Sequence, residues 1–144
     1  MDYRKFGTTY VMRLAPGEEI VEKVLWLAAV EEIKLATVTG LGAVDNVTLG
    51  IFSPDTKQYK AHLFHADFEI VSLTGTITTQ KYRPYAHLHM AVGDLSARVF
   101  GGHLNRAVVS ATAEIIMTVL PGEIDRQPDA RIGLNLMHFW PQEK

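Results

Sequence analysis

The 144-residue chain contains no cysteine. This absence excludes disulfides and thiolate metal ligands, so any bound metal must be held by nitrogen and oxygen atoms. The chain also lacks an apolar run of the roughly 20 residues that a membrane-spanning helix needs. Its first residues, MDYRKFGTTYV, do not contain the apolar core of a signal peptide. We therefore expect a cytoplasmic protein with no membrane partner.

Neither sign of charge dominates the composition. The 14 basic residues nearly balance the 16 acidic ones, for a formal net charge of −2. Arginines such as Arg106, Arg126 and Arg131 are scattered and form no basic run. This composition offers no general attraction to a DNA backbone or an anionic membrane. We expect these side chains to lie on solvated faces and to form ion pairs.

Two functional motifs, the glycine-rich phosphate-binding loop and the nucleophile elbow, are also missing. TGLGAVD (39–45) has two glycines of a phosphate loop but not the third, and a strand-like stretch follows it where a helix should begin. The sequence contains no Gly-x-Ser-x-Gly elbow, which argues against a nucleophilic triad. We interpret the two glycines as part of a tight turn between strands.

One segment has helical periodicity. Ile20, Val24, Leu27 and Val30 recur at spacings of three and four, and Pro16 suits a first helical turn. These features predict a helix whose buried face ends near Val30.

The remaining segments are rich in β-branched and aromatic residues and predict strands. Gly75 is expected to mark a bulge, and residues 121–131 a loop. We expect strands at 7–14, 47–53, 58–64, 68–79, 85–92, 95–100, 105–120 and 132–140, and a further β-branched run over 35–44 that Gly40 and Gly42 interrupt. The sequence therefore predicts one α+β domain spanning residues 1–144, a mostly antiparallel, many-stranded sheet with one or two helices.

Three of the six histidines fall between residues 86 and 104. His87 and His89 should point to the same side of a strand, because side chains alternate faces. If Gly93 and Asp94 form a two-residue turn, His89 lies opposite Arg98. Arg98 is then placed to bind an anionic ligand.

His103 would join this pair only through a local irregularity. Strict alternation turns it to the other face, and a bulge at the Gly101–Gly102 pair would turn it back. His87, His89 and His103 would then suit zinc or a similar divalent metal. The alternative is that all three are structural histidines with no metal.

Other titratable residues are weaker candidates. His62 and His65 should face opposite sides of a strand, so shared ligation would need a turn or a helix. His138 stands alone and is expected to be structural. Glu69 and Glu114 are the candidates for a fourth ligand.

Five stretches carry a resemblance to a known family. They are TGLGAV (39–44), FEIVSLTGTI (68–77), HLHMAVGD (87–94), GGHL (101–104) and TAEI (112–115). In this order they resemble the PPC domain (plants and prokaryotes conserved), in its stand-alone prokaryotic form. The resemblance implies an antiparallel sheet with helices, a homotrimer, and a zinc-type site at His87, His89 and His103.

The resemblance also implies a function. It points to a regulatory or assembly module with a proposed DNA-binding role, although this chain lacks the AT-hook that accompanies the domain in plants. The alternative, by fold analogy to alpha-acetolactate decarboxylase, is a metal-dependent lyase or hydrolase acting on a small oxo-acid. In that alternative the metal polarises a carbonyl or activates a water, and Arg98 orients the carboxylate.

Overall fold

The periodic segment forms helix α1, Ile20–Val30, in a computed structural model that describes residues 1–140. Its buried face comprises Ile20, Val24, Leu27 and Ala28. Two details of the prediction were wrong: Val30 is the last helical residue but is exposed, and Pro16 lies in a turn before the helix. The carboxylate of Glu19 accepts hydrogen bonds from the first helical N–H groups and from the N–H of Ala107, at 2.8 Å. One side chain thus caps the helix and ties its start to the sheet.

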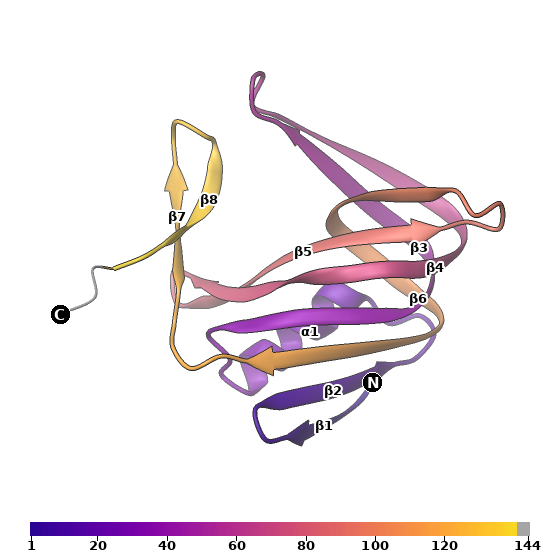
Figure 1. The fold of residues 1–144 in the computed structure, drawn as a ribbon, viewed down its shortest axis with the longest axis horizontal. Coiled ribbons are helices and arrows are strands. Elements are labelled where there is room, and N and C mark those ends of the chain that lie inside the picture. Colours follow the sequence, from indigo (N-terminus) through magenta and orange to yellow (C-terminus); the bar gives the residue numbers. More distant parts are fainter. Residues whose placement is uncertain (141–144) are drawn as a thin grey trace.

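The strands form one eight-stranded sheet, ordered β1-β2-β6-β3-β4-β7-β8, with β5 paired to β4 and β6 (Figure 1). All pairings are antiparallel except a single parallel contact between β4 and β7. The strands are β1 Asp2–Phe6, β2 Thr9–Leu14, β3 Ala36–Ser53, β4 Gln58–Gln80, β5 Arg83–Gly93, β6 Val99–Val119, β7 Asp125–Asp129 and β8 Leu134–His138. The α+β prediction is confirmed, with one helix among residues 1–140.

Strand β5 closes part of the sheet into a ring. It pairs with β4 on one side and β6 on the other, while β3 also pairs with both β4 and β6. Phe64, Phe68 and Phe100 pack together with ring centroids 5.1–6.4 Å apart. Two hairpins project beyond the rest of the sheet, a long one formed by β3 and β4 and a short one formed by β7 and β8 (Figure 1).

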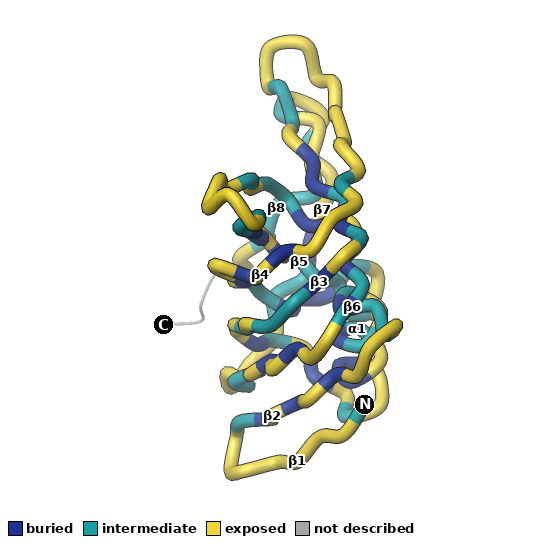
Figure 2. The backbone as a smooth tube through the Cα atoms, turned by 90° about the vertical axis from the view of Figure 1, so that its right-hand side faces the viewer, coloured by how far each residue is buried: buried dark blue, intermediate teal, exposed yellow. Residues whose placement is uncertain are grey.

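Buried residues alternate with exposed ones along the strands (Figure 2). The inward side chains of the strands share a core with the buried face of α1. The described residues include no helix long and apolar enough to cross a bilayer.

Several local predictions were wrong. Residues 2–14 form a hairpin of two strands, because Gly7 adopts a positive φ of 60° in a turn. Gly40 and Gly42 lie within the continuous strand β3 and accompany a register shift, not a turn between strands. Residues 125–129 are a strand, although they were expected in a loop.

Gly75 is not at a bulge either. Its pairing with Leu88 is regular, and the shift between β4 and β5 lies between Ile70 and Ser72. A Cβ atom on Gly75 would lie 2.1 Å from the carbonyl oxygen of His87. Because it has no Cβ, Gly75 allows β4 to lie close to β5 directly beside His87.

Candidate functional site

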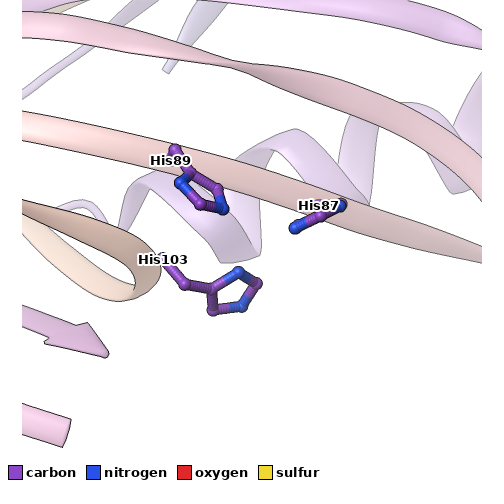
Figure 3. Close-up of side chains that lie close together, drawn as sticks. All are labelled: His87, His89 and His103. Atoms are coloured by element: carbon purple, nitrogen blue, oxygen red, sulfur yellow. The ribbon is translucent and has the colours of Figure 1, made fainter. Parts of the chain in front are cut away.

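The three histidines at residues 87, 89 and 103 converge on one outer face of the sheet (Figure 3). His87 and His89 extend from the same side of β5, whereas Leu88 and Met90 between and after them are buried. His103 extends from β6. The ring centroids lie 5.2–5.6 Å apart, and each ring offers a nitrogen within 4.8 Å of the others.

The register between β5 and β6 explains this convergence. His89 pairs directly with His103, and the pairing runs without a shift to Gly93 and Val99. Residues directly opposite each other in an antiparallel pair share a face. His103 therefore joins the other two without a register shift between β5 and β6, and the predicted bulge at Gly101–Gly102 is wrong.

The predicted register was wrong because the turn is longer than two residues. The Asp94 carboxylate accepts hydrogen bonds from the N–H groups of Ser96 and Arg98, at 2.9 and 3.0 Å, and thereby organises a five-residue connection. The guanidinium of Arg98 pairs with the same carboxylate, and its side chain is 72% exposed. Arg98 does not lie opposite His89 and does not line the pocket around the histidines.

A pocket of about 530 Å³ opens onto the three imidazoles, and we call it the histidine pocket. Its walls come from β3, β4, β5, β6, β7 and β8, so it lies between the β3–β4 hairpin and the β7–β8 hairpin. Besides the histidines it is lined by Gly50, Ile51, Phe52, Tyr59, Tyr85, Gly102, Arg126, Leu134, Asn135 and Leu136. A hydrogen bond from Lys57 Nζ to the carbonyl of Ala130, at 2.9 Å, joins the ends of the two hairpins.

Gly50 and Gly102 allow the β3 backbone and the ring of Tyr59 to lie close to His103. A Cβ on Gly50 would collide with the ring of Tyr59, whose centroid lies 6.1 Å from that of His103. A Cβ on Gly102 would lie 2.8 Å from the carbonyl oxygen of Gly50. Gly102 thus permits close packing of β6 against β3, and the glycine doublet forms no bulge.

Burial and neighbouring positive charge favour the neutral form of two of the imidazoles, His87 and His103. Desolvation, followed by the charges of Arg126, His103 and His89, lowers the pKa of His87 to about 4. Desolvation and then His89 lower the pKa of His103. Neutral imidazoles have the free lone pairs that a borderline cation such as zinc requires.

Arg126 also lines the histidine pocket, and the sequence patterns did not identify it as a site residue. It lies on β7, is only 6% exposed, and donates from Nη2 toward Nδ1 of His87 at 3.4 Å. No local pattern marks it, because its contacts come from β4, β5 and β8, at positions distant in the sequence.

The remaining candidates lie outside the cluster. His62 and His65 are exposed on β4, and His138 packs against Trp140 with centroids 4.4 Å apart. Glu69 and Glu114 are exposed and do not join the three histidines. Among residues 1–140, the group able to hold a metal consists of His87, His89 and His103.

Together, the fold and the pocket define a class: an antiparallel β domain with one helix and a cluster of three imidazoles on the sheet. A family model, the Plants and Prokaryotes Conserved (PCC) domain, matches residues 1–121. The chain belongs to this family, which confirms the resemblance seen in the sequence.

Solved structures agree with this assignment. A proposed DNA-binding protein from Bacteroides thetaiotaomicron superposes with a TM-score of 0.93 at 30% identity, covering 96% of each chain. A plant- and prokaryote-conserved (PPC) protein from Pyrococcus horikoshii superposes with a TM-score of 0.85 at 30% identity, covering 98% of this chain and 97% of that one.

Two curated relatives are much longer than this chain. The bifunctional protein GlmU of Synechococcus sp. (strain JA-3-3Ab) is 29% identical over 90% of the chain. AT-hook motif nuclear-localized protein 14 of Arabidopsis thaliana is 23% identical over 85%. The matched regions span 20% and 29% of the lengths of those two proteins.

The glycine doublet provides a test of how the site is built. We expect Gly102→Ala to destabilise the protein by about 1–3 kcal/mol, because the added methyl group meets the Gly50 carbonyl and overpacks the strand contact. Gly101→Ala is the matched control, since its Cβ would have its nearest contact at 3.4 Å. Urea unfolding of both variants measures the difference, and equal destabilisation by the two would contradict this explanation.

Proposed function

We propose that this protein is a metal-holding regulatory or assembly module of the PCC family. In this proposal His87, His89 and His103 bind one divalent cation, of which zinc is the expected example. The single observation that carries the proposal is the convergence of three imidazoles on one pocket. When bound, the cation would supply a Lewis-acidic centre open to a ligand from the pocket.

The residues present fit such a cation. All three candidate donors are imidazole nitrogens, the expected partners of zinc when thiolates are absent. Nitrogens bound tetrahedrally at about 2.0–2.1 Å from zinc lie roughly 3.3 Å apart. The donors of this site lie within 4.8 Å of one another, so modest side-chain rotation would bring them to that spacing.

The proposal includes assembly as a homotrimer, as the resemblance implies. Support comes from the face of the sheet that points away from α1. Val11, Leu41 and Ile116 are 40%, 58% and 44% exposed there. Neighbouring apolar side chains on an open sheet face are suited to contact between copies of a chain.

DNA is a second candidate ligand, favoured by the relative from Bacteroides thetaiotaomicron described as a proposed DNA-binding protein. The net charge of −2 and the scattered basic residues weigh against tight binding by this chain. The lyase or hydrolase alternative has no support from the comparisons, so the proposal stays with a binding role.

Metal content tests the main proposal. Protein purified without a nickel column, loaded with zinc and dialysed should retain about one equivalent per chain. His89→Ala should reduce this to about a tenth or less, because a ligand is lost. His62→Ala is the matched control, since it removes an exposed histidine of β4 outside the cluster. Elemental analysis that finds no zinc in the wild type, or equal zinc in all three proteins, would contradict the proposal.

Salt dependence tests the DNA candidate. Fluorescence anisotropy with a short labelled duplex should show weak binding at about 50 mM salt that is lost by about 200 mM, because counterion release dominates such complexes. Low salt is the most permissive condition. Undetectable binding there would remove DNA from the proposal.

A further inference from the structure

Within residues 1–140, the histidine pocket contains a fixed positive charge without a compensating negative one. Arg126 is 6% exposed, and none of the ion pairs in this range includes it. None of the aspartates and glutamates that the structure describes lines the pocket. A buried charge is costly unless it is paired, so the pocket favours an occupant that brings negative charge.

The guanidinium of Arg126 is held in place but not saturated. Its Nε donates to the Thr78 hydroxyl at 2.8 Å, and Nη1 donates to the Asn135 carbonyl at 2.9 Å. With the longer contact from Nη2 to His87, three of its five N–H groups have partners, and one on each Nη remains free. Free guanidinium N–H groups are strong donors to a carboxylate or phosphate.

Metal binding would increase this demand for an anion. A neutral imidazole that binds a cation through Nε2 carries its proton on Nδ1 and can no longer accept a hydrogen bond there. If His87 binds in this way, Nη2 of Arg126 needs a different acceptor. The cation would also add two positive charges to a pocket lined by neutral side chains and one arginine.

The rest of the pocket is suited to an apolar group. Ile51 and Phe52 of the β3–β4 hairpin face Leu134 and Leu136 of β8 across it, and Tyr85 contributes its ring. The guanidinium carbon of Arg126 lies 4.9 Å from the centroid of that ring. A volume of about 530 Å³ falls in the range typical of small-molecule sites.

We propose that the histidine pocket binds a small organic oxyanion, a carboxylate or phosphate ester with an apolar body, and that Arg126 anchors its charged group. This inference deepens the proposed function and rests on it for the charge of the metal. Arg126 and the β7–β8 hairpin lie beyond residues 1–121, the range that matches the family model. The anchor therefore lies outside the stretch that the family model matches.

A purely structural role for Arg126 is the competing explanation, since the side chain links β7 to β4 and β8. Ligand charge tests whether the pocket prefers anions, and the arginine variants below then separate the two explanations. We would titrate the zinc-loaded wild type calorimetrically with phenylacetate, phenyl phosphate and the neutral phenylacetamide. At least one anion should bind about tenfold or more tightly than the amide, because only the anions bring negative charge to the cation and the guanidinium. The two anion arms distinguish a carboxylate ligand from a phosphate ligand.

Arginine variants then assign the anchor. Arg126→Met should weaken binding of the preferred anion about tenfold or more while zinc content stays at the wild-type level. Arg98→Met is the matched control and should bind as the wild type does, because Arg98 is exposed and paired with Asp94. If Arg126→Met does not fold, Arg126→Lys takes its place, and it should weaken binding because an ammonium lacks the planar fork.

Each outcome of these experiments has a defined meaning. Equal binding of phenylacetate, phenyl phosphate and phenylacetamide, or no binding of either anion at about 10 mM, would overturn the inference. Wild-type affinity in the folded Arg126 variant would overturn it as well. Zinc content is measured on every sample, so full zinc without anion binding refutes this inference alone. Anion binding that depends on Arg126 in a protein without zinc refutes the metal proposal alone.

Discussion

The direct pairing of His89 with His103 across β5 and β6 is the constraint on which the candidate site depends. Shifting this register by one residue would turn His103 to the opposite face and separate the three imidazoles. Two local features help to hold the register: the hydrogen bonds of Asp94 in the connecting loop, and the close approach of Gly102 to Gly50. The site is therefore a consequence of strand pairing rather than of a flexible loop.

The chemistry of the pocket follows from its charge. Burial keeps His87 and His103 neutral, so their lone pairs are free for a cation. Arg126 adds a permanent positive charge, and none of the acidic side chains described by the structure offsets it within the pocket. A metal and an anion would each make the other easier to accommodate. The cluster and the arginine thus fit one binding site better than two independent features.

Local patterns predicted the parts of this structure that depend on nearby residues. The spacing of Ile20, Val24 and Leu27 gave the helix, and strand alternation placed His87 and His89 on one face. The geometry that depends on other elements was not predictable in the same way. A two-residue turn after Val92 is the common choice, but the Asp94 side chain builds a longer loop and displaces Arg98. The sequence thus predicted that the three histidines converge, but it attributed this to a bulge at Gly101–Gly102 that the structure does not contain.

Arg126 shows the same limit more clearly. Its partners Thr78 and His87 lie 48 and 39 residues away in the sequence.

X-ray absorption at the zinc edge of the zinc-loaded protein most directly tests the central claim, that His87, His89 and His103 bind one cation. The account predicts three imidazole nitrogens at about 2.0–2.1 Å from zinc. A spectrum dominated by oxygen ligands, with at most one imidazole, would contradict it.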